Sequence, residues 1–391
     1  MSNTHRSKSR TVVFSLVPLI FILVILEIAG RILYPFDPDG RAMVMARRDP
    51  RLNLSYFSQG TDAKAILFDM YRMDKRYLPF LGYLGAPNSR LPTISTNALG
   101  FRDRAIAPRQ PKEFRVLLLG GSTAWGLGAS SNDHTISANL ERTLNQRGDG
   151  IRYRVMNAAY LGYIARQEMT VLTGFMEDFD PDLVVSLTGY NDLTTMIHGT
   201  GEIFDRPETR ELGEAVTRVL RPMNTTTALR KVAGSLGIWR LVVYFREVRQ
   251  VSAPKAGEYA FDQASSDKWV PRVAEMYKIM ARFSGDHGRR YVIALQPDIE
   301  TTRKRMGAEE AKLRSAARTG STGFAAAYAS YRRNLAAALG ATDDAQFIDL
   351  GGAFDAVSEP VFIDGCHLTD RGYAHLAEVL ADRISWPAGG S

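Results

Sequence analysis

The sequence contains a single cysteine, Cys366, so no disulfide can form within the chain. It also lacks an HExxH motif or any histidine–cysteine cluster with the spacing of metal ligands, so no metal site is expected. Neither GxGxxG nor GxxxxGK[ST] is present, and no cofactor is expected. The net charge of +7 comes without a dense basic block interleaved with aromatics. Nucleic acid is therefore not an expected partner, whereas acidic glycans and anionic lipid headgroups are compatible with this charge.

One long apolar run lies near the N-terminus. Residues 11–26 carry no charge, and apolar character continues to residue 33, interrupted by Glu27 and Arg31. Since about 20 residues cross a bilayer, residues 11–33 are predicted to span a membrane. A cleaved signal peptide is the alternative, but the run has no A-x-A-like cleavage site, which favours an uncleaved anchor. Basic residues before the run place residues 1–10 in the cytoplasm, so we expect a single-pass protein of the cell inner membrane whose remainder is periplasmic or extracellular.

Five short apolar segments alternate with helical patterns in the rest of the chain. The predicted strands are residues 115–119, 153–156, 183–187, 291–295 and 347–350. Strands separated by helices indicate βαβ units, hence an α/β fold with a parallel sheet covered by helices on both faces. Ligands of such sheets bind beyond the carboxyl ends of the strands. Ser122, Gly162 and Asn191 each follow a predicted strand end, so we expect three loops to meet at one cleft.

Ser122 is the candidate nucleophile. It follows the first strand and two glycines, and a helical pattern with Ile136, Leu140 and Leu144 on one face comes after it. A strand, a glycine turn and a helix can lift a serine out of a sheet edge, with its N–H at a helix start. The segment is not a GxSxG elbow, because Ala124 stands at the second glycine position. A helix N-cap is the alternative role for this serine.

A serine nucleophile needs a general base and an acceptor that orients the base. Of the six histidines, only His367 has an acid three residues earlier on a loop after a strand; that acid is Asp364. Cys366 could serve as a thiol nucleophile, but it directly precedes His367 and is expected to pack as a small apolar group. Asn191 and Asp192 could form an ordinary turn, in which Asp192 ties its loop.

Four blocks in this order resemble the SGNH (GDSL-type) hydrolase superfamily: residues 120–123 (GGST), the Gly162 loop, Gly189-x-Asn191-Asp192 and Asp364-x-x-His367. Residues 100–103 (GFRD) resemble membrane-anchored bacterial members. The resemblance covers roughly residues 99–381 and implies a flavodoxin-like three-layer αβα fold with acyl-ester chemistry.

The resemblance also implies roles for five residues. Ser122 would be the nucleophile, His367 the base and Asp364 its orienting acid. The N–H groups of Ser122 and Gly162 and the side-chain amide of Asn191 would bind the oxyanion. The sequence departs from the family at two positions, since Gly121 replaces an Asp and Thr123 replaces a Leu.

The domain organisation predicted from these signals has four parts: a cytoplasmic tail (1–10), the anchor (11–33), a neck that packs on the main domain (34–98) and a hydrolase domain (99–391). An insertion, residues 193–282, separates the third and fourth strands and is basic between residues 218 and 249. Its helix with Ile238, Leu241, Val242 and Phe245 on one stripe is expected to form a cap facing the domain, or alternatively a lid or a surface leaning on an anionic leaflet. A second insertion, 300–324, is expected to be a mobile loop beside the site.

These signals predict an anchored extracytoplasmic serine esterase that removes acyl, above all acetyl, groups from a glycan or a lipid-linked sugar. The first alternative is an O-acyltransferase that moves an acetyl group onto a cell-surface or exported polysaccharide, with a membrane acyl-donor protein as a further partner. The second is a non-catalytic binding module with the same fold. An intact set of Ser122, Asn191, Asp364 and His367 argues against this last reading.

Overall fold

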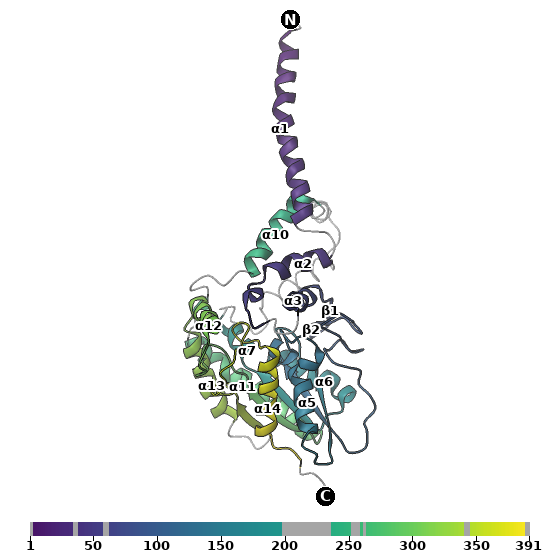
Figure 1. The fold of residues 1–391 in the computed structure, drawn as a ribbon, viewed down its shortest axis with the longest axis vertical. Coiled ribbons are helices and arrows are strands. Elements are labelled where there is room, and N and C mark those ends of the chain that lie inside the picture. Colours follow the sequence, from purple (N-terminus) through teal and green to yellow (C-terminus); the bar gives the residue numbers. More distant parts are fainter. Residues whose placement is uncertain are drawn as a thin grey trace. The chain divides into compact units, whose positions relative to one another are not determined.

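The computed structural model describes residues 3–33, 38–57, 62–197, 236–251, 259–260, 263–339 and 345–387. Contacts divide the chain into two compact units, one of residues 1–50 with 215–252 and one of residues 51–214 with 253–391. Figure 1 shows the elements of both units along the chain. Much of the basic segment predicted in the first insertion lies outside the described residues. The four-part domain organisation stays a prediction.

The first unit contains three described helices, α1 (Asn3–Leu33), α2 (Pro38–Arg48) and α10 (Gly237–Val251). Within α1, the 18 residues Leu16–Leu33 are long and apolar enough to cross a membrane, judged by length and composition. The carboxylate of Glu27 pairs with Arg31 one turn later, at 2.6 Å. A charged pair on one helix face reduces the cost of placing either charge near a bilayer.

Helix α10 meets α1 through two glycines. A Cβ at Gly30 would overlap the carbonyl of Gly237, and a Cβ at Gly237 would overlap the carbonyl of Glu27. The Glu27 carboxylate also accepts a hydrogen bond from the Ile238 N–H at 3.2 Å, which caps the first turn of α10. On the predicted stripe of this helix, Val242 and Phe245 are more than half exposed.

The second unit is built on a five-stranded parallel sheet, as predicted. Its order is β4 (Arg152–Asn157), β3 (Glu113–Gly120), β5 (Leu183–Thr188), β7 (Arg290–Leu295) and β9 (Gln346–Asp349). Every residue of β5 is buried, as expected for a central strand with both faces covered. Numbered along the chain, this strand order is 2-1-3-4-5, the flavodoxin-like order.

Two groups of helices cover the sheet. Helices α5 (Ile136–Asn145) and α14 (Asp370–Arg383) pack on each other, and α11 (Gln263–Asp286) packs on both α6 (Ala165–Phe179) and α13 (Phe324–Leu339). Connections between parallel strands are right-handed. The step from β3 to β4 runs opposite to the later steps, so α5 lies on one face and α6, α11 and α13 lie on the other. The predicted three-layer α/β fold is therefore confirmed.

Smaller elements complete this unit. They are η1 (Pro50–Asn53), α3 (Ala63–Arg72), the hairpin of β1 (Lys75–Leu78) and β2 (Gly82–Gly85), α4 (Ser122–Trp125), η2 (Asn132–His134), α7 (Tyr190–Ile197), α12 (Ala308–Gly320), and the paired β6 (Tyr259–Ala260) and β8 (Ser321–Thr322). The hairpin and α3 come from the segment predicted as the neck (34–98).

The second insertion is not a loop throughout, because α12 occupies half of it. Alanine, glutamate and leucine favour a helix here, and Glu309 and Glu310 stand in its first turn, where acidic residues are stabilising. The Lys304 ammonium pairs with the Glu310 carboxylate at 2.7 Å, and both side chains are fully buried. The Glu310 carboxylate also accepts the backbone N–H groups of Val361 and Phe362, which fastens this part of the insertion to the rest of the unit. The prediction of a mobile loop is therefore wrong for this part.

Candidate active site

Ser122 lies where strand β3 gives way to helix α4. The strand ends at Gly120, Gly121 is the N-cap and Ser122 is the first helical residue, so the N–H of Ser122 lies at a helix start. Strand β5 runs beside β3, and the chain leaves these two strands toward opposite sides of the sheet. This is the topological switch point, at which open α/β sheets form their ligand crevices.

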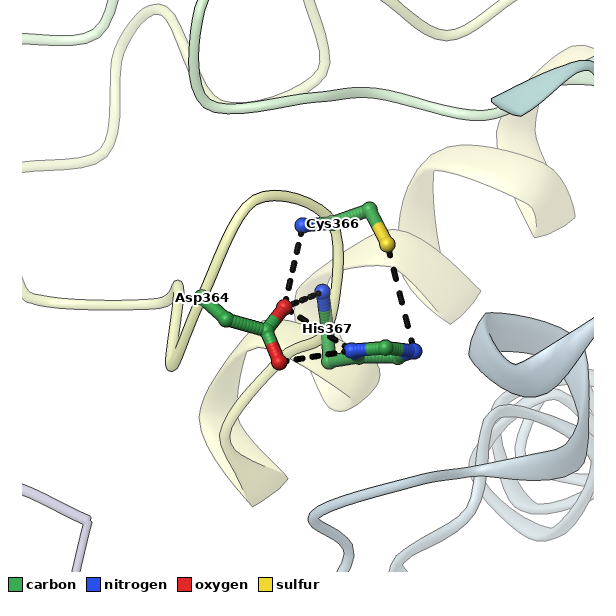
Figure 2. Close-up of side chains that lie close together, drawn as sticks. All are labelled: Asp364, Cys366 and His367. Atoms are coloured by element: carbon green, nitrogen blue, oxygen red, sulfur yellow. Dashed lines mark hydrogen bonds and ion pairs between the residues drawn. The ribbon is translucent and has the colours of Figure 1, made fainter. Parts of the chain in front are cut away.

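His367 stands between Ser122 and Asp364. Its Nε2 lies 2.6 Å from Oγ of Ser122, and its Nδ1 lies 2.7 and 2.8 Å from the two carboxylate oxygens of Asp364. Oδ1 of Asp364 also accepts the backbone N–H groups of Cys366 and His367, as Figure 2 shows. The Ile363 N–H donates to the His367 carbonyl and closes the loop. The backbone therefore holds the carboxylate against one imidazole nitrogen and leaves the other nitrogen for the serine.

The electrostatics of this group follow from the pairing of carboxylate and imidazole. Burial alone would raise the pKa of Asp364, but His367 and then Arg51 outweigh it and hold that pKa well below its usual range. Burial would lower the pKa of His367, and the Asp364 carboxylate outweighs it and raises that pKa above its ordinary value. The arrangement stabilises an imidazolium, which is the form that a general base takes on when it removes a proton.

In the described part of the chain, Asp364, Cys366 and His367 are also close enough together to be considered as metal ligands. Their possible donor atoms lie within 4.8 Å of one another. Figure 2 shows Asp364 at Nδ1 of the imidazole and the Cys366 sulfur toward Nε2, at 3.9 Å. The carboxylate and the thiol thus contact different nitrogens of the imidazole, and Nδ1 already has the carboxylate as its partner. Cys366 is buried, as expected for a small apolar group.

Asn191 and the Gly162 loop approach Ser122 from the ends of the neighbouring strands. The Nδ2 of Asn191 donates to the Tyr163 carbonyl at 2.9 Å, which ties the first turn of α7 to the loop that contains Gly162. The same Nδ2 fills the space where a Cβ at Gly121 would lie. The structure thus brings the Asn191 amide and the residue after Gly162 to the start of α4, beside the serine. The oxyanion roles of these groups stay predictions.

The two positions at which the sequence departs from the pattern that it resembles have local explanations. A side chain at Gly121 would displace the Asn191 amide, so glycine is required for this approach. The Thr123 hydroxyl donates to the Cys366 carbonyl at 3.2 Å and accepts from the buried Gln296 amide at 3.3 Å. A leucine could do neither. Thr123 therefore links the serine turn directly to the loop that carries His367.

Asp192 ties its loop, as the sequence suggests. One carboxylate oxygen accepts the Ala165 N–H at the start of α6, and the other accepts the hydroxyls of Thr188 and Tyr277. Asp192 thereby fastens the segment after Gly162 to the end of strand β5. Because Asn191 precedes it, the same contacts fix where α7 begins.

Residues 100–103 (GFRD) contact the segment that follows Ser122 and the end of strand β4. The buried guanidinium of Arg102 donates to the carbonyls of Gly126 and Ala129 and stacks on Trp125 at 4.6 Å. Asp103 accepts the Asn157 N–H at the end of β4 and pairs with Arg154 at 2.9 Å. These contacts fix the loop that follows Ser122.

A second serine–histidine–aspartate group lies in the same unit. The Ser130 hydroxyl contacts Nδ1 of His134 at 2.8 Å and Oδ2 of Asp370 at 2.5 Å, and the same Nδ1 is 3.7 Å from that carboxylate. Serine and aspartate thus share one imidazole nitrogen, so this histidine does not stand between them. The half-exposed His134 lacks the two-sided arrangement found at His367.

Sequence reasoning missed the residues that hold the Asp364 loop from outside. The Tyr56 hydroxyl donates to the Phe362 carbonyl at 2.6 Å, and Glu310 accepts the N–H groups of Val361 and Phe362. Arg51 contacts Oδ2 of Asp364 at 3.3 Å. No local spacing signals these contacts, because Arg51 and Tyr56 lie more than 300 residues away along the chain.

No family model matches the chain, and no curated protein sequence matches it. Among solved structures, it is similar to a catalytic mutant of an acetylxylan esterase from Geobacillus stearothermophilus, at 13% identity over 71% of this chain and 97% of that one, with a TM-score of 0.39. It is also similar to a GDSL-like lipase from Bacteroides thetaiotaomicron (13% identity, 71% and 90% covered, TM-score 0.34). A third is a putative lipolytic protein of the G-D-S-L family from Desulfitobacterium hafniense (11% identity, 69% and 99% covered, TM-score 0.37). Similarity at this level does not identify a substrate.

Proposed function

We propose that this chain is a serine esterase of SGNH type. The proposal rests on the position of the His367 ring between two side chains, with Ser122 at its Nε2 and Asp364 at its Nδ1. In the proposed reaction the Ser122 oxygen attacks the ester carbonyl while Nε2 of His367 takes the hydroxyl proton. The departing alcohol then receives that proton. Water finally cleaves the acyl-serine and releases the carboxylic acid, with His367 again as the base.

The negative charge on the attacked carbonyl oxygen needs donors near Ser122. In this proposal they are the N–H groups of Ser122 and Gly162 and the Asn191 amide. The position of that amide over Gly121 supports its inclusion. Preorganised donors of this kind stabilise a tetrahedral intermediate by several kcal/mol in a site protected from water.

Hydrolysis of p-nitrophenyl acetate and of longer esters by the full chain tests the reaction. Ser122→Ala should abolish turnover and labelling by a serine-reactive fluorophosphonate, with a rate loss of several orders of magnitude. Ser130→Ala is the matched control, since it removes a serine hydroxyl from a histidine and an aspartate in the same unit. Equal loss in both variants, or full activity in Ser122→Ala, would refute the assignment. A folded, inactive and unlabelled wild type would favour the binding-module alternative.

The finer proposal is that the ester is an acetyl group on a glycan or lipid-linked sugar and that α1 anchors the protein in the cell inner membrane. The apolar stretch of α1 supports the anchor, and the exposed Trp239, Val242 and Phe245 of α10 suit a membrane–water interface. Arg303 and Arg305 are exposed beside α12, while Lys304 between them is buried, so two of the three basic residues there remain for an acidic polymer. A periplasmic reporter fused after Ser391 tests the topology, and a mature N-terminus near Gly30 would show cleavage instead.

Transfer to a sugar hydroxyl is the second candidate, because an acyl-serine can be resolved by a bound alcohol as well as by water. Incubation with an activated acetyl ester and candidate oligosaccharides, followed by mass spectrometry, separates the two reactions. Acetylated oligosaccharide would establish transfer. Free acetate alone across a broad acceptor panel, together with cleavage of acetylated glycans, would leave hydrolysis.

A further inference from the structure

The carboxylate of Asp364 has a third partner besides the His367 ring and the backbone of its own loop. Oδ2 of Asp364 lies 2.7 Å from Nδ1 of His367 and 3.3 Å from Nη1 of Arg51. The Arg51 side chain is only 13% exposed, so solvent screens its charge weakly. Its other terminal nitrogen lies 3.8 Å from the sulfur of Met70 on α3. A neck residue thus reaches the carboxylate oxygen that also faces the imidazole.

We infer that Arg51 is a positioning residue of the active site, which fixes the carboxylate of Asp364 and weakens its hold on the proton of His367. The inference rests on the proposed function, since it assigns a role within the same site. A cation beside a carboxylate lowers the negative potential that the carboxylate exerts on a neighbouring imidazole. Arg51 therefore keeps more of His367 in the neutral form that can accept the serine proton.

The other titratable groups that interact with Asp364 or His367 carry no positive charge. In the described part of the chain these are the thiol of Cys366 and the phenols of Tyr56, Tyr190 and Tyr373. Burial raises the pKa of all three phenols, so they are neutral near pH 7. Apart from His367 itself, Arg51 is thus the positive charge that the described part of the chain places against this carboxylate.

Tyr56 separates a charge effect from a structural one. It comes from the same neck segment and holds the same loop, because its hydroxyl donates to the Phe362 carbonyl at 2.6 Å. Loss of this hydroxyl would loosen the loop without removing a charge. Loss of the Arg51 guanidinium would remove a charge and an orienting contact together.

The experiment is an NMR pH titration of His367 in the full chain, labelled with ¹⁵N-histidine, in lipid nanodiscs. His367→Gln identifies the signal. Arg51→Gln should raise the titration midpoint of His367 by about 0.5 to 1 pH unit, while Arg51→Lys should stay near the wild type. Tyr56→Phe should leave the midpoint unchanged, as should Arg72→Gln, whose neck guanidinium pairs with Asp69 instead. The apparent pKa on the acidic side of the pH profile of kcat/KM should rise by the same amount as the midpoint.

The titration uses no substrate, so the two proposals can fail separately. A shifted midpoint in a protein that hydrolyses no ester would retain the role of Arg51 and refute the esterase. An unchanged or lowered midpoint in folded Arg51→Gln would overturn the inference, whatever the activity. Unfolding of this variant by circular dichroism would also overturn it, because Arg51 would then serve stability. A shift in Tyr56→Phe as large as that in Arg51→Gln would show a loop effect and not a charge effect.

Discussion

The side-chain amide of Asn191 occupies the space beside Gly121 in which any other residue would place its Cβ. Gly121 immediately precedes the candidate nucleophile, and Asn191 lies in the first turn of the helix after the neighbouring strand. A glycine on one loop therefore sets how closely a hydrogen-bond donor from another loop can approach the serine. A glycine at this position thus has a steric reason.

Gly121→Ala is expected to lower kcat about 10²–10³-fold, with the fold retained. The added methyl group would push the Asn191 amide away from the serine, and loss of one oxyanion donor costs about 2.7–4 kcal/mol of transition-state stabilisation. Steady-state kinetics and thermal unfolding measure the two effects. Gly174→Ala is the matched control, because a Cβ at that helical glycine meets no atom within 4 Å beyond its chain neighbours and the backbone of its own helix.

Combining the variants tests whether Gly121 acts through Asn191. If the alanine at 121 works by displacing the amide, then adding Asn191→Ala should cost little more than either change alone. Fully additive losses would mean that the two residues act independently.

Thr123→Val should weaken the link between the serine turn and the His367 loop. Valine keeps the shape of threonine but cannot bond to the Cys366 carbonyl or accept from Gln296. A buried amide left without its acceptor costs about 1–3 kcal/mol, and this loss should appear in denaturant unfolding. Thr123→Ser, which keeps the hydroxyl, should retain most of the stability. A Thr123→Val variant as stable as the wild type, or less destabilised than Thr123→Ser, would contradict the role of the hydroxyl.

The fold and the candidate triad were predictable because their signals are local or ordered along the chain. Each strand of the main sheet is a short apolar run bounded by turn residues, and Asp364 lies within one turn of His367. Arg51, Thr123 and Glu310 gave no such signal, since their partners are set by how distant segments pack. The helix α12 differs from the predicted loop for another reason, because its alanine, glutamate and leucine residues favour a helix locally.

Lys304→Met is expected to destabilise the protein strongly. It would leave the fully buried Glu310 carboxylate without its cation, and breaking a buried pair in this way costs about 3–5 kcal/mol. Because Glu310 also accepts the N–H groups of Val361 and Phe362, the loop of His367 should lose order as well. Glu275→Gln, which breaks an exposed pair with Arg282, should cost no more than about 1 kcal/mol. Equal losses of unfolding free energy in the two variants would contradict the expectation that the buried pair stabilises the fold more than the exposed one.

Glu168 is a buried carboxyl on α6 that should make stability fall as the pH rises. Burial, together with the charge of Asp192, raises the pKa of Glu168 to about 8. In the unfolded chain this group ionises near pH 4.3, so between these values the folded state holds a proton that the unfolded state has released. Its contribution to the free energy of unfolding therefore declines as the pH rises through this window, by at most about 1.4 kcal/mol per pH unit, and levels off above pH 8.

Glu168→Gln should remove this decline, because glutamine keeps the shape of the protonated acid and cannot ionise. Urea unfolding from about pH 5 to pH 9 would measure it, with the variant showing a flatter dependence than the wild type. Glu177→Gln on the exposed side of the same helix is the control and should leave the slope unchanged. A wild-type slope that Glu168→Gln leaves intact would place the proton on another group, and a stability that rises with pH through this window would contradict the raised pKa itself.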